Sequence, residues 1–374
     1  MRNLKLALVI FALIIFAGVS NSFAEKKIKV GFIGPLTGKA SFLAVDSVEV
    51  LRRLIDKKNS TGGIKGNKID LIVADDSYET SKTLSGYQKL VHIDDVKVLF
   101  AFTYGGVIAL ADRANKDGVI VIDTLDCDDE IASLSENVFC VAKKTEDLGV
   151  FNARHALKHN NYPAGIIYFD GDPFLPKVAK ATRDTLIAGG GEVTVFEGVS
   201  VGTQDFRSLL LKLKAKGVKA AFFYGYDDFG LAMKQGREIG LEAQYYSLTG
   251  VNSPGFLSSA GSTVNGAFTA GWFAPRTQAF NDFIAEHQKQ VRREPLLEVS
   301  TIPTYDVGRI LISGIEESID ENGALNIDQL SRYLYSLKNY QGLSGNISMD
   351  SDGAVRSLKV GMYKFVDGKF VDVD

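Results

Sequence analysis

Residues 28–33 read IKVGFI, a nearly unbroken apolar run, and the turn residues Gly34-Pro35 follow at once. A short apolar run bounded by turn signals is typical of a buried strand. Beyond this turn, four apolar residues recur at the spacing of one helix face, namely Ala44, Val48, Leu51 and Ile55. Thr61-Gly62-Gly63 then ends the helical pattern. The opening of the chain therefore predicts a strand, a loop and a helix in that order.

The same unit is repeated along the chain in two sets. The first set has further strand patterns at 68–74, 98–102 and 119–123, and helix patterns at 80–93 and 107–115. The second set has strand patterns at 164–170, 192–198, 220–224 and 244–248, with helix patterns at 177–188, 204–216 and 228–239. Strands that alternate with helices predict a parallel sheet covered on both faces. Because 374 residues exceed the usual size of one core, we expect two α/β lobes.

The last third of the chain has a different pattern. Helices are predicted at 277–291, 305–319 and 325–337, and residues 355–373 alternate between apolar and polar. Asp367-Gly368 within this tail is typical of a hairpin turn. We therefore expect extra helices and a β tail that belong to the two lobes.

The first residues have the pattern of an export signal. Arg2 and Lys5 give a positive start, residues 6–19 are small or apolar, and Ser22-Phe23-Ala24 places small residues at both recognition positions. The apolar run is too short for a membrane anchor, which needs about 20 residues. The sequence therefore predicts a signal peptide over residues 1–24, cleavage after Ala24 and a periplasmic location.

Charge and motifs exclude several function classes. The chain has 42 Lys and Arg against 45 Asp and Glu, whereas a nucleic-acid-binding protein needs a basic surface. The sequence has no dinucleotide fingerprint, phosphate loop or Gly-x-Ser-x-Gly elbow, so we expect no cofactor, no catalytic residue and no enzymatic activity. His155 and His159 would share a helix face, but no third ligand is recognisable, so we expect no metal site.

Two further features have more than one interpretation. Cys127 and Cys140 form an even pair in an exported chain, so a disulfide is possible, but sequence does not give their separation in space. Four acidic residues follow a predicted strand, namely Asp126, Asp128, Asp129 and Glu130. They suit the start of a helix, and they equally suit the rim of a cleft at the carboxyl end of that strand.

Three segments, in order along the chain, resemble the leucine/isoleucine/valine-binding protein family: residues 28–37 (IKVGFIGPLT), 62–66 (GGIKG) with Asp75-Asp76, and 304–306 (TYD). The resemblance implies a type I periplasmic binding protein fold, with two doubly wound parallel-sheet lobes joined by a three-strand hinge. Lobe 1 would comprise residues 25–144 and 272–345, and lobe 2 residues 145–271 and 346–374. It also implies a monomer that closes on a small-molecule ligand and docks on the membrane permease of an ABC transporter.

The resemblance also implies a set of ligand-binding residues. The loop that grips the ligand carboxylate is similar to Tyr104-Gly105-Gly106, where bare backbone N–H groups at a helix start suit an anion. The next contact loop resembles the segment containing Leu125 and Cys127. Phe174 and Tyr226 match an aromatic wall, Phe42 lies in a first-lobe loop, and Thr249 stands where the family often has an acid for the ligand ammonium.

The leading functional interpretation is therefore the solute-binding component of an ABC importer. Its ligand would be an amino acid or a related small carboxylate or amide. Because Thr249 brings no charge, the ammonium of an amino acid would need another acid, and candidates on cleft loops are Asp126, Asp128, Asp227 and Asp228. The alternatives are an importer component for an aromatic carboxylate, a sensor or receptor subunit of the same fold, and a secreted enzyme.

Overall fold

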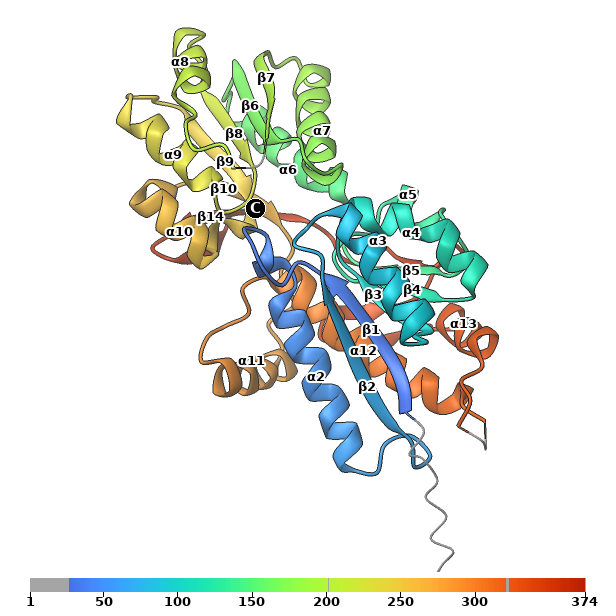
Figure 1. The fold of residues 1–374 in the computed structure, drawn as a ribbon. Coiled ribbons are helices and arrows are strands. Elements are labelled where there is room, and N and C mark those ends of the chain that lie inside the picture. The colour runs from blue at the N-terminus through green and yellow to red at the C-terminus, as the bar shows by residue number, and fades with distance from the viewer. Residues whose placement is uncertain (1–26, 201, 321–322, 374) are drawn as a thin grey trace, which may run out of the picture.

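The computed structural model describes residues 27–200, 202–320 and 323–373, which form two lobes joined by crossing segments (Figure 1). The predicted signal peptide lies outside the described residues. Among the described residues, no helix has both the length and the apolar character needed to span a membrane.

The first lobe is built on a six-stranded sheet. Its order is β13-β5-β4-β3-β1-β2, and every neighbouring pair is parallel. The strands are β1 (Lys27–Gly34), β2 (Lys68–Asp75), β3 (Val98–Ala101), β4 (Ile120–Asp123), β5 (Val138–Val141) and β13 (Ala354–Val355). Strands β3, β4 and β5 are buried along their whole length, as the continuous apolar runs of a sheet covered on both faces require.

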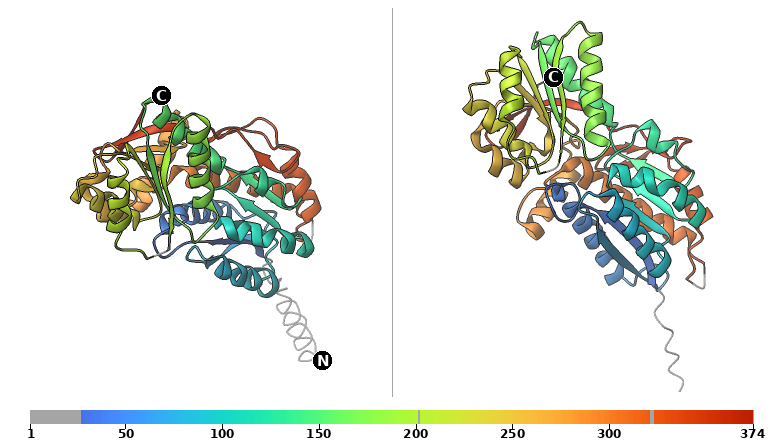
Figure 2. Two further views of the ribbon diagram at one scale, coloured as in Figure 1. Left: turned by 90° about the horizontal axis from the view of Figure 1, so that it is seen from above. Right: turned by 45° about the horizontal axis from the view of Figure 1, so that its top comes forward.

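Helices cover both faces of this sheet, as Figure 2 shows from two directions. They are α2 (Val45–Ser60), α3 (Thr80–Gln88), α4 (Tyr104–Asp117), α5 (Asp129–Ala132), α11 (Gln278–Val291), α12 (Glu298–Ser318) and α13 (Ile327–Tyr335); α3 continues as a π-helical turn, Lys89–Ile93. Helix α12 begins earlier than the predicted residue 305. It includes Pro303, because a proline removes only one helical hydrogen bond and the buried residues on both sides hold the helix in place.

The second lobe has a seven-stranded sheet in the order β15-β14-β10-β9-β8-β6-β7. Its parallel strands are β6 (Ala164–Phe169), β7 (Val193–Val199), β8 (Ala220–Tyr224), β9 (Gln244–Leu248) and β10 (Phe268–Gly271). Strands β14 (Gly361–Val366) and β15 (Lys369–Asp372) add an antiparallel hairpin at one edge. The hairpin confirms the alternating tail and its Asp367-Gly368 turn.

The helices of the second lobe are α6 (Thr145–Lys158), α7 (Phe174–Ala188), α8 (Arg207–Ala215), α9 (Phe229–Glu238) and α10 (Pro254–Ala260). Short 3-10 turns lie at Ser41–Leu43 in the first lobe and at Thr249–Asn252 and Gly261–Val264 in the second. The described architecture is thus the predicted α/β fold of two doubly wound, mainly parallel lobes.

The chain crosses between the lobes three times: after β5, after β10 and between β13 and β14. The third crossing differs from the expected boundary at 345/346. The small hairpin of β11 (Tyr340–Gly342) and β12 (Gly345–Ile347) leads into β13, which pairs with β5 in the first sheet. The chain therefore returns to the second lobe only after Val355, because Ala354 and Val355 are buried beside Cys140 and Val141.

Candidate ligand site between the lobes

A cavity lies where the carboxyl ends of the two parallel sheets face each other. Its walls come from the segments that follow β2, β4 and β5 of the first lobe, and from those that follow β8, β9 and β10 of the second. The 3-10 turn at Ser41–Leu43 and the first turns of α6, α7 and α12 complete the lining. In open α/β sheets this edge is where ligands bind.

The lining is mainly apolar and aromatic. It consists of Phe42, Leu43, Tyr78, Leu125, Asp126, Lys143, Leu148, Phe174, Leu175, Gly225, Tyr226, Leu248, Thr249, Gly250, Gly271, Trp272, Leu297 and Val299. With the lobes in this arrangement, the space left in the cavity for the centres of water-sized molecules is about 50 Å³. A mainly apolar and aromatic lining with a few polar groups is typical of small-molecule sites.

Three aromatic rings form the centre of the lining. The Tyr226 ring lies 5.0 Å from the Tyr78 ring and 6.3 Å from the Phe42 ring, measured between centroids. Tyr226 belongs to the second lobe, and Tyr78 and Phe42 belong to the first. The rings therefore meet across the cleft, so the structure has its lobes closed.

Asp126 and Lys143 are the charged side chains in the described lining, and they form a buried ion pair. The Lys143 ammonium also donates to the backbone oxygen of Leu125 at 2.7 Å and lies 5.0 Å from the centre of the Phe174 ring. The Asp126 Oδ1 atom accepts a second hydrogen bond, from the Thr145 hydroxyl at 3.3 Å. The Asp126 Oδ2 atom is buried and has no partner among the described residues.

Burial has the largest influence on the pKa values of the carboxyl groups in this region. It raises the pKa of Asp126 by more than the Lys143 charge lowers it. Behind it, Asp123 is also fully buried, and burial together with the Asp126 charge raises the pKa of the Asp123 carboxyl. The Asp123 Oδ1 atom accepts from the backbone N–H groups of Leu125 and Asp126 at 2.7 and 3.0 Å, which fixes the turn after β4.

Asp172 of the second lobe reaches the first lobe at the start of α4. Its Oδ2 atom accepts from the Gly105 N–H at 3.2 Å, and its Oδ1 atom accepts from the Phe174 N–H at 2.9 Å and from the Tyr78 hydroxyl at 3.3 Å. One carboxylate thus caps the N-termini of both α4 and α7, where the helix dipoles favour negative charge. One of the backbone donors expected to hold a ligand carboxylate is therefore engaged by the chain itself.

A second contact between the lobes surrounds Lys177 of α7. Its ammonium lies 3.0 to 3.2 Å from carboxylate oxygens of Asp128, Glu130 and Glu146, and 2.9 Å from the Tyr104 hydroxyl. The Tyr104 hydroxyl donates to Asp128 at 2.7 Å. Burial alone would raise the pKa of Asp128, but the hydrogen bonds from Tyr104 and the Thr145 N–H, with the Lys177 charge, hold it below its ordinary value.

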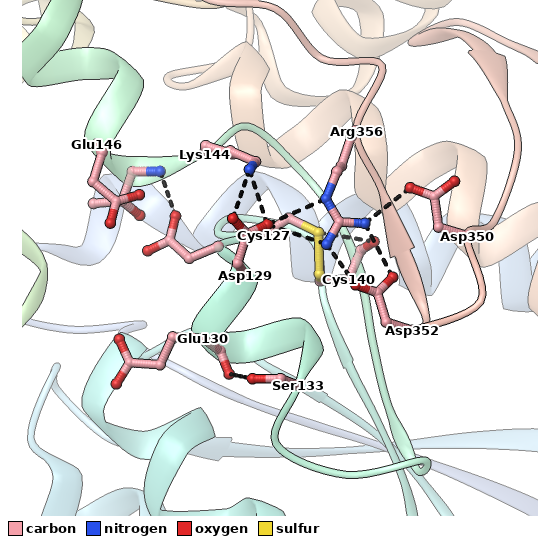
Figure 3. A network of polar contacts seen from close by, with 12 residues as sticks. Cys127, Asp129, Glu130, Ser133, Cys140, Lys144, Glu146, Asp350, Asp352 and Arg356 are labelled. Carbon is pink, nitrogen blue, oxygen red and sulfur yellow. Dashed lines mark hydrogen bonds and ion pairs between the residues drawn. A yellow bond between two sulfur atoms is a disulfide. The ribbon is translucent and has the colours of Figure 1, made fainter.

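Residues 124–130, here called the site loop, also have an outward side (Figure 3). Asp129 pairs there with Lys144 at 2.8 Å and with Arg356 at 3.2 Å, and Arg356 also pairs with Asp350 and Asp352 at 2.9 and 2.6 Å. Lys144 lies on the first crossing between the lobes and Arg356 on the third. The outward side of the site loop therefore ties two crossing segments together.

The two cysteines are joined in a disulfide, Cys127–Cys140. It links the middle of the site loop to β5, which leads directly to Lys143 and Lys144 (Figure 3). The pairing that the sequence left open is therefore present. Both interpretations of the acidic cluster also apply, because Asp126 lines the cavity while Asp129 and Glu130 lie in the first turn of α5.

The structure brings five of the nine sequence-predicted site residues into the cavity lining: Phe42, Leu125, Phe174, Tyr226 and Thr249. The other four lie elsewhere. Tyr104 is fully buried with its hydroxyl toward Asp128, Gly105 contacts Asp172, Gly106 packs against Thr83, and Cys127 is in the disulfide.

Sequence reasoning missed Tyr78, Lys143 and Trp272 as lining residues. Tyr78 and Trp272 follow β2 and β10 within a few residues, so the rule that ligands lie beyond strand ends could have found both. Nothing in the sequence distinguishes Lys143 from an exposed lysine, because both would look the same in a segment that connects a strand to a helix.

The two histidines of the predicted helix do share a face of α6, with ring centroids 4.4 Å apart. His155 is buried, and its Nδ1 atom lies 3.1 Å from the Tyr246 hydroxyl. Across the part of the chain that the structure describes, no group of three His, Cys, Asp or Glu residues is arranged to hold a metal ion.

Comparisons with known proteins agree with this geometry. A family model described as "Periplasmic binding protein" matches residues 27–368. The "Leu/Ile/Val-binding protein homolog 3" of Brucella melitensis is 26% identical over 94% of this chain and 95% of its own length.

Two solved structures share the fold. One is LivJ of Streptococcus pneumoniae, described as a branched-chain amino acid transporter substrate binding protein in complex with isoleucine; it has a TM-score of 0.81 and 22% identity, and the match covers 92% of this chain and 98% of that one. The other is an ABC transporter solute binding protein of R. palustris in complex with benzoate, with a TM-score of 0.79, 17% identity and coverage of 93% and 96%. The chain therefore belongs to the periplasmic binding protein family, and its relatives there are Leu/Ile/Val-binding proteins.

Proposed function

We propose that this protein is the solute-binding component of an ABC importer. It captures a small molecule in the cavity between the lobes and delivers it to a membrane permease. The observation that carries this function is the apolar cavity enclosed by the carboxyl ends of two parallel sheets, whose lobes are linked by three crossings. Two lobes on such a hinge can open to admit a ligand and close to exclude water.

Several finer points belong to the same proposal. The signal peptide is cleaved after Ala24, the protein works as a monomer in the periplasm, and it releases its ligand unchanged. The pattern of residues 1–24 supports export, and the family supports a binding function. The proposed contacts with the ligand come from Phe42, Leu125, Phe174, Tyr226 and Thr249, which all line the cavity.

The ligand is a small molecule with an apolar body, such as an amino acid or a related carboxylate or amide. The apolar and aromatic lining supports this size and character. The relatives support the same range, since one solved neighbour holds isoleucine and another holds benzoate.

A thermal-shift screen tests the importer function. The panel contains amino acids, aromatic acids, short amides and dicarboxylates, each at high concentration. A ligand at a hundred times its dissociation constant stabilises the folded state by about 2.7 kcal/mol, which raises the melting temperature by several degrees. Release of the compound unchanged would support binding, and its chemical turnover would favour an enzyme. A panel in which no compound raises the melting temperature would contradict a solute-binding role.

A further inference from the structure

The charges that line the cavity already balance each other. Asp126 and Lys143 are the charged side chains of the described lining, and they pair directly. Both are almost fully buried, with side chains 1% and 3% exposed. Neither charge is therefore left over for an ionic group of a ligand.

The charged groups just outside the lining are engaged by the chain as well. The Asp172 carboxylate accepts hydrogen bonds from Gly105 and Phe174 at the starts of two helices. Lys177 is surrounded by Asp128, Glu130 and Glu146. An ionic ligand group in the cavity would therefore meet a like charge beside any opposite one, because a carboxylate would face Asp126 next to Lys143 and an ammonium would face Lys143 next to Asp126.

Two polar atoms of the described lining nevertheless lack a partner, the Tyr226 hydroxyl and the Asp126 Oδ2 atom, and of these the ionised carboxylate oxygen can only accept a hydrogen bond. The Asp126 Oδ2 atom is buried and accepts no hydrogen bond from the described residues, although a buried carboxylate oxygen normally accepts at least one. Its Oδ1 atom is already engaged by Lys143 and Thr145. A ligand in the cavity that carries a hydrogen-bond donor could therefore satisfy this carboxylate oxygen.

We propose that the ligand is uncharged: a small apolar or aromatic molecule with an N–H or O–H group, such as a primary carboxamide, that donates to Asp126 Oδ2. This inference rests on the proposed importer function and narrows its ligand class. A zwitterionic amino acid or a free aromatic acid would bury a charge without a counter-charge, which is very costly. A carboxamide fills the same volume and supplies the missing donor.

Calorimetry on matched ligands tests the inference with the full mature chain. Benzamide is compared with benzoate, and 4-methylpentanamide with 4-methylpentanoate and leucine; within each set the apolar body is nearly constant and the charge changes. The amides should bind more tightly than the ions of the same set by at least about tenfold, the factor for one hydrogen bond to a charged group. Tighter binding of benzoate or leucine would overturn the uncharged ligand and leave the importer function standing.

Two variants, at positions three residues apart, test whether the ligand contacts Asp126. Asp126→Asn replaces the free oxygen by an amide, so affinity for the best amide of the series should fall by about tenfold to a hundredfold. Asp129→Asn makes the same change on the outward side of the site loop and should leave affinity unchanged. Equal losses in the two variants, or none in either, would overturn the role of Asp126. The ligand series on the wild-type chain decides the question if Asp126→Asn does not fold.

Discussion

The site loop forms two aspartate–lysine pairs of the same composition in opposite surroundings. Asp126 pairs with Lys143 inside the cavity wall, and Asp129 pairs with Lys144 on the outward side. The side chains of the first pair are 1% and 3% exposed, whereas those of the second are 71% and 32% exposed. The aspartates are three residues apart and the lysines are adjacent, so the chain provides its own matched comparison.

The difference shows what burial does to one and the same ion pair. Water screens Asp129 and Lys144, so separating them costs little. Asp126 and Lys143 lost their hydration when the lobes folded, and each depends on the other for a counter-charge. The buried pair is therefore expected to contribute little to the net free energy of unfolding. Removing one of its two partners should nevertheless destabilise the fold strongly, because the other charge stays buried without a counter-charge.

The largest expected effect comes from removing one buried charge. Lys143→Met leaves Asp126 unpaired in the cavity wall and should lower the free energy of unfolding by about 3–5 kcal/mol. Lys144→Met is the matched control and should cost about 1 kcal/mol or less. Urea denaturation of the two variants measures both values. Similar losses would mean that the two pairs do not differ as their burial indicates.

Removing the disulfide should have the next largest effect. Cys127 and Cys140 are 13 residues apart in sequence, and a link over such a distance is expected to contribute about 3 kcal/mol by restricting the unfolded chain. We expect the double variant Cys127→Ala/Cys140→Ala to unfold at correspondingly lower urea. Reduction of the wild-type protein with dithiothreitol should give the same shift, and an unchanged midpoint would contradict the link.

The Arg356 network should show a smaller effect that depends on salt. Arg356 holds Asp129, Asp350 and Asp352 at the third crossing, and it is partly exposed. Arg356→Gln should therefore cost about 1 kcal/mol in dilute buffer, and much of that difference should disappear in 1 M NaCl because the Debye length falls to about 3 Å. A large loss that salt leaves unchanged would indicate a packing role for the guanidinium stem.

The smallest expected effect concerns how stability changes with pH. The contributions of Asp129 and Asp126 to the free energy of unfolding should change in opposite directions as the pH falls. The hydrogen bond from Lys144 holds the pKa of Asp129 below its ordinary value of 3.8, so its stabilisation is present above that pH and is lost as the pH falls further. Burial raises the pKa of Asp126, so its folded form binds a proton more tightly, and its contribution improves as the pH falls toward 3.8. Stability profiles of Asp129→Asn and Asp126→Asn against wild type measure this, and slopes of the same sign would contradict it.

The sequence predicted the fold well because each element has a strong local pattern. The apolar run 28–33 became β1, and the alternating tail became the hairpin of β14 and β15. Strand-end loops likewise placed Leu125, Phe174 and Tyr226 in the cavity lining. The third crossing was predicted ten residues too early, at 345/346, because β13 contains only Ala354 and Val355, which are too few for a recognisable strand pattern.

The polar part of the site could not be predicted in the same way. Lys143 and Lys144 are neighbours with the same local sequence signal, and only the tertiary structure buries one and exposes the other. The Asp172 contact with Gly105 joins residues from different lobes, so no local pattern contains it. Ion pairs and helix caps between the lobes depend on how the two lobes pack against each other, and a local sequence pattern does not contain that information.

Closure of the lobes around a ligand is the central claim, and small-angle X-ray scattering measures it directly. The probe is the compound that raises the melting temperature most in the thermal-shift screen, added at saturating concentration to the mature chain. The contacts of Tyr226 with Phe42 and Tyr78 belong to the closed form, so the radius of gyration should fall when the probe is added. A radius that stays the same with and without the bound probe would contradict the account.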